Sequence, residues 1–286
     1  MKQIFVVGSL NYDFTIQSDR FPNKGETIHG HGFTSNPGGK GANQAVAAAR
    51  ARAHVYMVGC IGEDTFGQII IDELKRNQVD VSFVSKVDAP TGTAIITLAE
   101  NDNQIIINQG ANHQINNRQI KKAFEKANKD DLLILQFEIP LEQIIYSIEL
   151  ANDIGMKIIL NPAPAVYKID QFINRIDYLI PNETEKNIIF SDKFIEKSFN
   201  NHLITTLGDK GIKYEYKDEV LHIPSHKVKV VDTTAAGDTF IGYFVAMISK
   251  GCEINKALQI SNKAAAKTVT KLGAMQAIPH IEEVIS

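Results

Sequence analysis

The sequence predicts an α/β fold in which a mainly parallel sheet lies between two layers of helices. Short runs rich in valine, isoleucine and leucine alternate along most of the 286 residues with longer amphipathic segments. Parallel strands need such crossover helices, which cover the sheet on both faces. The composition, 44% hydrophobic and 22% charged, is that of a folded globular chain long enough for one large core, or for a main domain with a small appendage.

The individual elements follow from this alternation. Six apolar runs have the length and composition of strands, and they are residues 4–7, 55–58, 132–136, 157–160, 178–180 and 202–206. Apolar side chains at helical spacing predict helices over residues 43–52, 66–77, 141–153 and 254–270, and an apolar helix runs through 241–249. Since no repeat or extended linker separates these segments, we expect a single domain over residues 1–286.

Two segments interrupt the alternation, residues 27–34 and 93–109. In the second, two β-type runs flank the turn-forming string NDN at residues 101–103. Together they predict a small antiparallel sheet outside the main one, drawn from about residues 14–34 and 93–109. A sheet of this size does not fold alone, so we expect it to cover a cleft or to pair with a second subunit.

Charge and cysteine content exclude several classes of function. The 30 basic and 33 acidic residues give a net charge of −3, and the basic residues are scattered, so we expect no nucleic-acid partner. Cys60 and Cys252 lie far apart without metal-ligand spacing, which predicts neither a disulfide framework nor a structural zinc site. No apolar run approaches membrane-spanning length and no signal-peptide pattern is present, so we expect a cytoplasmic protein without a membrane partner.

A glycine and a carboxylate stand at the start of an apolar helix in the string VDTTAAGDTF, residues 231–240. Helix N-termini expose unpaired N–H groups and carry partial positive charge, so the amides near Ala236 and Gly237 suit a phosphate oxyanion. Asp238 would then stand beside the transferring phosphoryl group. For an isolated Gly-Asp pair, however, the simpler interpretation is that Asp238 caps the helix.

A second glycine-rich string, PGGKGANQ at residues 37–44, runs directly into an alanine-rich helix. Its glycines allow backbone amides to approach a ligand, and Lys40 and Asn43 add donors for sugar hydroxyls or phosphate. It is not a Walker A motif, because Gly41 rather than serine or threonine follows Lys40. A flexible loop that caps a helix is the alternative interpretation.

Polar side chains also follow several predicted strands. Asn11 and Asp13 come after the first strand and Glu138 after the strand at 132–136, which is where open α/β sheets bind ligands. These side chains are suited to a polyol, although for Asn11 and Asp13 taken alone a pair of Asx turns is the better interpretation. The carboxylates of the string NETE, residues 182–185, suit either water-mediated Mg²⁺ or a helix dipole. The string TLGDKG, residues 206–211, suits either a nucleotide or a tight hairpin turn.

Taken together, these strings resemble the ribokinase-like family of carbohydrate kinases, also called the PfkB family. The resemblance spans nearly the whole chain and is carried by the strings GSLNYD (8–13), GET (25–27), GGKGANQ (38–44), GAN (110–112), NPAPA (161–165), PNETE (181–185), TLG (206–208) and DTTAAGDTF (232–240). The Gly-Asp signature is specific to the family. The GGKGANQ and NPAPA strings point to its ribokinase branch. The resemblance implies a three-layer αβα sandwich with a small antiparallel β lid.

The resemblance also implies roles for particular residues. Asp238 would be the general base that takes the proton from the 5-hydroxyl of a sugar. The amides of Ala235, Ala236, Gly237 and Asp238 would form the anion hole for the γ-phosphate. The residues implied to hold the sugar are Asn11, Asp13, Gly39, Lys40, Gly41, Asn43, Glu138 and Asp238. Those implied to contact ATP are Asn182, Thr206, Leu207, Gly208, Asp209, Lys210, Gly211, Gly237 and Asn262, with Glu185 ordering Mg²⁺ through water.

A monovalent cation, usually K⁺, activates the ribokinase branch. The positions that match its site, mostly through backbone carbonyls, are Asp232, Thr234, Thr268, Lys271, Gly273 and Ala277. The sequence departs from the family pattern at Pro37, and Thr268 and Lys271 stand at variable positions. The lid would also make the contact of a homodimer.

The activity implied is the ATP-dependent phosphorylation of D-ribose at O5 to give D-ribose 5-phosphate. A related kinase acting on 2-deoxyribose, fructose or a nucleoside is one alternative, although the glycine loop argues against a nucleoside. A non-catalytic sugar-sensing protein on the same fold is the other. The retained Asp238 and Gly237 argue against a sensor, because a sensor has no need of a base.

Overall fold

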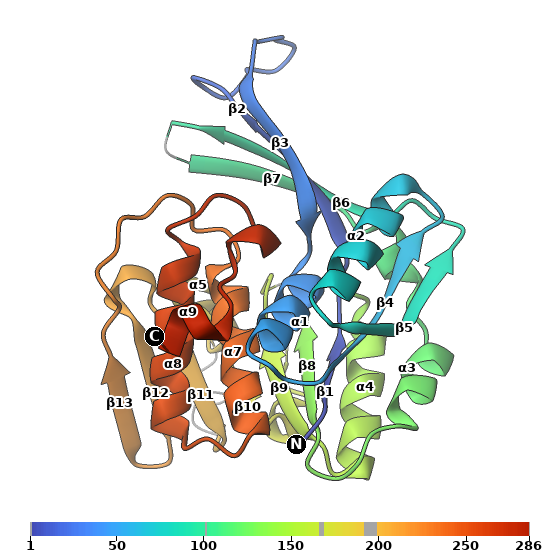
Figure 1. Ribbon diagram of the computed structural model, residues 1–286, viewed down its shortest axis with the longest axis vertical. Coiled ribbons are helices and arrows are strands. Elements are labelled where there is room, and N and C mark those ends of the chain that lie inside the picture. The colour runs from blue at the N-terminus through green and yellow to red at the C-terminus, as the bar shows by residue number, and fades with distance from the viewer. Residues whose placement is uncertain (1, 101, 166–168, 192–198, 286) are drawn as a thin grey trace.

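A computed structural model describes residues 2–100, 102–165, 169–191 and 199–285. A nine-stranded sheet with the spatial order β13-β12-β11-β10-β9-β8-β1-β4-β5 forms its centre (Figure 1). Its strands are β1 (Ile4–Val7), β4 (Val55–Gly62), β5 (Asp80–Val87), β8 (Leu132–Gln136), β9 (Lys157–Asn161), β10 (Tyr178–Leu179), β11 (His202–Thr206), β12 (Ile212–Tyr216) and β13 (Glu219–Ile223). Neighbouring strands from β11 to β5 pair in parallel, while β12 and β13 form an antiparallel hairpin at one edge. The sheet is therefore mainly parallel, as the sequence predicts.

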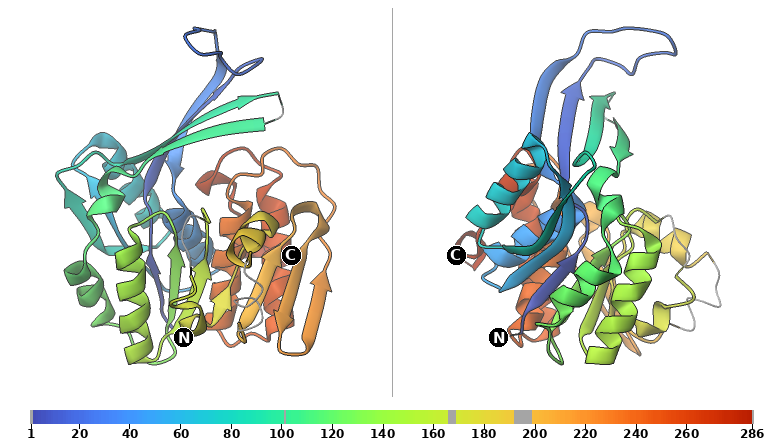
Figure 2. Two further views of the ribbon diagram at one scale, coloured as in Figure 1. Left: turned by 180° about the vertical axis from the view of Figure 1, so that it is seen from behind. Right: turned by 90° about the vertical axis from the view of Figure 1, so that its right-hand side faces the viewer.

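Helices cover both faces of this sheet, because alternate side chains of each strand point to opposite sides (Figure 2). Ile4 and Val6 of β1 join a core under one helical layer, whereas Phe5 and Val7 join the core under the other. The first layer contains α1 (Lys40–Arg50), α2 (Thr65–Arg76), α7 (Ala236–Ser249), α8 (Ile254–Thr268) and α9 (Ile281–Ile285). The second contains α3 (Asn117–Phe124), α4 (Leu141–Ile154) and α5 (Glu183–Ile189).

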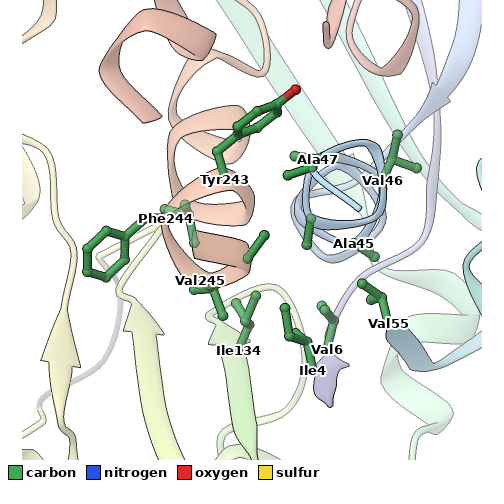
Figure 3. Close-up of a cluster of buried hydrophobic side chains, with 14 of the residues drawn as sticks. Ile4, Val6, Ala45, Val46, Ala47, Val55, Ile134, Tyr243, Phe244 and Val245 are labelled. Atoms are coloured by element: carbon green, nitrogen blue, oxygen red, sulfur yellow. The ribbon is translucent and has the colours of Figure 1, made fainter. Parts of the chain in front are cut away.

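Helices α1 and α7 lie side by side over the middle of the sheet, and side chains of both meet those of the strands below (Figure 3). Glycine makes this close approach possible. A Cβ atom added to Gly242 of α7 would lie 2.5 Å from both the Gln44 carbonyl oxygen and the Ala47 Cβ of α1. The small residue therefore sets how close the two helices come.

A second, four-stranded sheet projects from the main body, with the order β3-β2-β6-β7 (Figures 1 and 2). Its strands are β2 (Asn11–Gln17), β3 (His31–Gly38), β6 (Gly92–Ala99) and β7 (Asp102–Asn108). The prediction of a purely antiparallel small sheet is wrong in one respect, since the central pair of β2 and β6 is parallel. That pair forms because both strands leave the main sheet in the same direction.

Several predicted boundaries differ from the observed ones. The first helix begins at Lys40 rather than at residue 43, because Gly39 with a φ of 90° turns the chain directly into it. Residues 27–30 precede β3 instead of belonging to a strand. Asn11 and Asp13 lie on β2 and not in a turn after β1. The turn predicted at 101–103 includes Asn101, which lies outside the described residues.

The sequence also missed three strands of the main sheet, β5, β12 and β13. Their side chains are mostly half-buried or exposed, so polar and charged residues interrupt the apolar runs. Short 3-10 turns complete the described structure at Gly110–Gln114, Ile173–Arg175, Gly208–Lys210 and Met275–Ala277.

Candidate active site

Asp238 lies in the first turn of α7, and its carboxylate is held from outside that helix. Its Oδ2 accepts a hydrogen bond of 3.0 Å from Nδ2 of Asn43, and its Oδ1 accepts one of 2.9 Å from Nε2 of Gln44. The residue that caps α7 is Ala235, in the left-handed conformation with a φ of 60°. Asp238 therefore does not serve as the helix cap, which was the simpler interpretation of the Gly-Asp pair.

The backbone before Asp238 forms the predicted anion site. The left-handed turn at Ala235 directs the chain into α7, and the Ala235 carbonyl already accepts a hydrogen bond from Thr239. The amide nitrogens at the start of a helix have no partner within the helix, and they carry its positive end. Gly237 is exposed, and a Cβ atom added there would meet no atom within 4 Å. An anion can therefore reach these amides from solvent.

The glycines of the string at residues 38–44 serve close packing. A Cβ atom on Gly39 would lie 2.7 Å from the Asn11 amide nitrogen, and one on Gly41 would lie 2.7 Å from both the Gly8 carbonyl carbon and the Ser9 amide nitrogen. These contacts bring the start of α1 against the segment that links β1 to β2. Residues from both glycine-rich strings thereby meet at one place.

Asn11 and Asp13 point to the same side of β2, next to Glu138. The Oδ1 of Asn11 accepts a hydrogen bond of 2.7 Å from Asn112, so neither Asn11 nor Asp13 forms the Asx turn that the sequence left open. Glu138 accepts hydrogen bonds from the Ser9 hydroxyl and from the Lys40 amide. The Oδ1 of Asp13 and the Oδ1 of Asn43 are buried and have no hydrogen-bond partner among the residues that the structure describes. Two acceptors thus remain for a hydroxyl-bearing ligand.

The site concentrates negative charge. Burial, together with the neighbouring carboxylates of Glu138 and Asp238, raises the pKa of Asp13 to about 7. Burial alone would lower the pKa of Lys40, but Asp238, Glu138, Glu185 and Asp13 surround its ammonium group and raise the pKa instead. Lys40 is therefore the cation that balances four carboxylates.

Several of these residues line one of two cavities. The first, about 550 Å³, lies at the foot of the second sheet and is lined by Asn11, Glu138, Asn112 and residues of 107–113 together with Phe137 and Pro164. The second, about 240 Å³, is lined by Lys40, Asn161, Ala163, Ile180, Asn182, Glu185, Thr206, Thr233, Ala235, Ala236, Gly237, Asp238 and Ile241. Asn11 and Glu138 thus border one cavity, and Asp238 with its anion site borders the other.

The predicted nucleotide residues continue outward from the second cavity. Asn182 and Glu185 form a capping box at the start of α5, in which Asn182 Oδ1 accepts from the Glu185 amide and Glu185 Oε2 accepts from the Asn182 amide. Burial raises the pKa of Glu185. The structural interpretation of this string is therefore correct, whatever further role Glu185 has.

Residues 207–211 form the connection of the β11–β12 hairpin, which was the alternative interpretation of that glycine string. Gly211 lies against the segment 223–225, where an added Cβ atom would be 2.1 Å from the Ile223 carbonyl oxygen. The Nδ2 of Asn262 donates a hydrogen bond of 2.7 Å to the Pro224 carbonyl in the same segment. The hairpin connection and Asn262 therefore meet on one stretch of backbone, with Thr206 leading back to the cavity.

Only part of the predicted cation site comes together through side chains. Asp232 accepts hydrogen bonds from the Thr234 amide and hydroxyl through Oδ1 and from the Gly273 amide through Oδ2. The other side chains point elsewhere. The Thr268 hydroxyl donates to the Ala264 carbonyl within α8 and is also hydrogen-bonded to the Thr239 hydroxyl, and the Lys271 ammonium pairs with Glu283. Ala277 closes the 3-10 turn after residue 274.

Nearly the whole chain matches a known family. The model of the pfkB family carbohydrate kinases matches residues 1–281. The chain belongs to this family. It is 40% identical over 293 residues to the ribokinase of Bacillus subtilis, with full coverage of both chains, and 34% identical to a deoxyribokinase of Salmonella typhimurium, covering 98% of this chain and 96% of the relative.

Solved structures of family members agree. The ribokinase of Thermotoga maritima superposes with a TM-score of 0.89 at 36% identity, covering 100% of this chain and 98% of that one. The ribokinase of Arabidopsis thaliana, solved in complex with ribose and ATP, gives a TM-score of 0.89 at 29% identity, covering 99% and 97%. The three-layer fold with its small second sheet is therefore that of the family.

Sequence reasoning gave no role to four buried polar residues of the site, namely Ser9, Gln44, Asn112 and Asn161. All four stand inside strings that carry the family resemblance, so their positions in the sequence were visible but their contacts were not. Among the described residues, no group of three or more histidine, cysteine, aspartate and glutamate side chains could hold a metal ion. In the described part of the chain, no helix combines the length and apolarity needed to cross a membrane.

Proposed function

We propose that this family member transfers the γ-phosphoryl group of ATP to O5 of D-ribose, giving D-ribose 5-phosphate. The observation that carries the proposal is the position of Asp238, a buried carboxylate that lines the second cavity beside exposed helix-terminal amides and binds Asn43 of the glycine-rich string. The relatives named ribokinase at full coverage support ribose as the acceptor.

In this mechanism Asp238 accepts the proton of the sugar 5-hydroxyl as that oxygen attacks. The helix-terminal amides of residues 235–238 stabilise the charge on the transferring group, because they are fixed in place before the reaction. Lys40 borders the same cavity and supplies a positive charge near that group. Gly39 and Gly41 let the start of α1 pack closely enough to place Lys40 and Asn43 there.

The sugar hydroxyls would be held by Asn11, Asp13, Asn43 and Glu138. The unpartnered Oδ1 atoms of Asp13 and Asn43 are acceptors that a hydroxyl donor can satisfy. Asn112 takes the Oδ1 of Asn11, which leaves the Asn11 amide nitrogen as a donor. A hydroxyl group needs both kinds of partner, and this arrangement supplies both.

ATP would occupy the second cavity and extend along the residues that converge beside it, namely Asn182, the 206–211 segment and Asn262. Magnesium fits this site, because Mg²⁺ is usually held by one or two carboxylates, water and the phosphates themselves, and Glu185 supplies one carboxylate at the cavity wall. When bound, the ion would neutralise charge on the β- and γ-phosphates.

A monovalent cation site is a further part of the proposal. It is supported by the Asp232 carboxylate, which binds the Thr234 amide in its own loop and the Gly273 amide of the loop after α8 and so holds the two loops together. K⁺ stimulation of turnover would support this site, and equal rates in K⁺ and Na⁺ would contradict it.

We further propose that the second sheet is a lid and that it joins two copies of the chain. Apolar side chains on this sheet remain exposed, among them Phe33 at 64% and Ile106 at 72%, and an apolar hollow of about 360 Å³ lies between Phe14, Phe33 and Ile95. Sedimentation velocity of wild type and Phe33→Asp would test this, because a monomeric wild type would refute it. We also propose a cytoplasmic location, supported by the free thiols of Cys60 and Cys252.

The test of the activity is coupled ADP release with Mg-ATP on D-ribose, 2-deoxyribose, fructose and adenosine. Preference for ribose supports the proposal, whereas preference for another acceptor favours a related kinase, a possibility consistent with the likeness to a deoxyribokinase. Asp238→Asn should reduce kcat by at least about a thousandfold, while ATP affinity measured by calorimetry stays within about twofold. A sugar-sensing protein would bind ribose without releasing ADP.

A further inference from the structure

Asp238 is bound to a chain of buried amide side chains that comes from several elements. Gln136 of β8 donates from Nε2 to the Oε1 of Gln44 on α1, at 2.7 Å. The Nε2 of Gln44 donates to Oδ1 of Asp238 and, at 3.1 Å, to Oδ1 of Asn161 at the end of β9. Asn161 in turn donates from Nδ2 to the Ile180 carbonyl at 3.0 Å.

The orientation of each amide in this hydrogen-bonded series is fixed by its last acceptor, the backbone carbonyl of Ile180. A backbone carbonyl only accepts hydrogen bonds, so the amide nitrogen of Asn161 must face Ile180 and its oxygen must face Gln44. Gln44 must then present its nitrogen to Asn161, and the same nitrogen reaches Asp238. The oxygen of Gln44 consequently faces Gln136. The Ile180 carbonyl therefore determines that Gln44 presents its amide nitrogen, a hydrogen-bond donor, to Asp238.

The packing around these residues leaves little room for another arrangement. Gln44 and Gln136 are fully buried. A Cβ atom at Gly8 would lie 2.0 Å from the Oε1 of Gln136, which places that side chain tightly against the backbone. Within the described part of the chain the same Oε1 has no hydrogen-bond partner, so the Gln136 side chain is held in this orientation at a cost in folding free energy.

We infer that Gln44 is a positioning residue that orients the carboxylate of Asp238 for proton acceptance, and that Gln136 and Asn161 fix the direction of its amide. This inference rests on the proposed function, since it assigns a role toward the base of that reaction. Gln44 and Asn43 together take one lone pair on each oxygen of Asp238 and hold its plane. A carboxylate held in this way keeps a lone pair directed at the incoming hydroxyl.

Gln44→Met tests the inference, because methionine has a similar shape and cannot donate. We expect kcat to fall by about 10- to 100-fold, with KM for sugar and for ATP within about threefold of wild type. Loss of a donor disfavours the charged form of the Asp238 carboxylate. In a plot of kcat against pH, the fall of kcat on the acidic side (the acidic limb) should therefore move to higher pH by about one unit. Asp13, Glu185 and Lys40 also interact electrostatically with Asp238, and Glu138 acts on Asp13 and Lys40, so only the difference between variant and wild type is diagnostic.

Two further variants separate positioning from folding. Gln136→Met leaves Gln44 in place but removes the bond that fixes its direction, so we expect a smaller fall in kcat, about 3- to 10-fold, and a smaller shift of the limb. Gln119→Met is the matched control, because Gln119 is a buried glutamine that donates to the Gly59 and Phe83 carbonyls away from the site. Gln119→Met should lower the urea concentration at the midpoint of unfolding without moving the acidic limb of the pH profile of kcat.

The inference is overturned if Gln44→Met keeps its kcat, or if its kcat falls while the acidic limb stays where it is in wild type and in Gln119→Met. Failure of the proposed function looks different. In that case the wild-type protein itself releases no ADP with any of the sugars.

Discussion

Replacing Asp13 by asparagine should make the folded protein more stable at pH 8. Burial and two neighbouring carboxylates raise the pKa of Asp13 from 3.8 to about 7. The folded state therefore binds a proton more tightly than the unfolded state, and stability falls as pH rises from about 4 to 7. The shift of about 3 units corresponds to a ceiling of about 4 kcal/mol in the free energy of unfolding.

The expected gain is smaller than this ceiling. The asparagine amide would be a buried donor in a site where Asp13 Oδ1 has no partner, at a cost of about 1–3 kcal/mol, and residual solvation reduces the charge penalty. We expect a net gain of about 1–3 kcal/mol at pH 8 and none at pH 4.5. Sugar binding should weaken at the same time, because asparagine cannot replace a charged acceptor.

Urea unfolding of the ligand-free protein at pH 4.5, 6.5 and 8 measures this difference. Asp88→Asn is the control, because Asp88 is exposed at the end of β5. If Asp13→Asn were no more stable than wild type at pH 8, or if its gain were the same at every pH, then the charge burial inferred for this site would be wrong.

Three further outcomes follow from the packing. Gly242→Ala places a methyl group against α1, so it should lower the free energy of unfolding in urea by about 1–3 kcal/mol and also lower kcat. An unchanged urea midpoint would contradict the close contact between α1 and α7. Burial lowers the pKa of His202 to about 4, so stability should fall by about 1–2 kcal/mol as pH drops from 6.5 to 4, and His202→Gln should show less of this loss. Asp64 caps α2 and also binds the Thr91 amide and hydroxyl, so Asp64→Ala should lower the free energy of unfolding by about 1–3 kcal/mol, and a loss below about 0.5 kcal/mol would count against this double role.

The main sheet could be predicted because its central strands are buried on both faces. Residues 4–7 and 132–135 are continuous apolar runs, and the strands predicted at 4–7 and 132–136 agree in their bounds with β1 and β8. The first three residues of β2 escaped prediction, because Asn11 and Asp13 are typical of turns, whereas the predicted small sheet began at about residue 14. These residues belong to a strand because β3 and β6 pair with them, and a local pattern carries no information about those partners.

The candidate site was predictable as a set of residues but not as a set of contacts. The two glycine-rich strings stood out, and the structure brings Asn43 to Asp238, nearly two hundred positions away. That Gln44, its neighbour on α1, reaches the same carboxylate could not be foreseen. Adjacent helical side chains point about 100° apart, and both reach Asp238 only because Gly242 lets α7 approach so closely.

Strand β3 ends at Gly38 and α1 begins at Lys40, so Gly39 alone connects the second sheet to α1. The side chains of Asn43 and Gln44 on this helix bind the Asp238 carboxylate. A connection of one residue leaves the second sheet little freedom to move without moving α1. Any tilt of the projecting sheet therefore reaches Asn43 and Gln44 as a rotation at the start of α1. The second sheet and α1 would therefore move together, and a longer linker in place of Gly39 would let one move without the other.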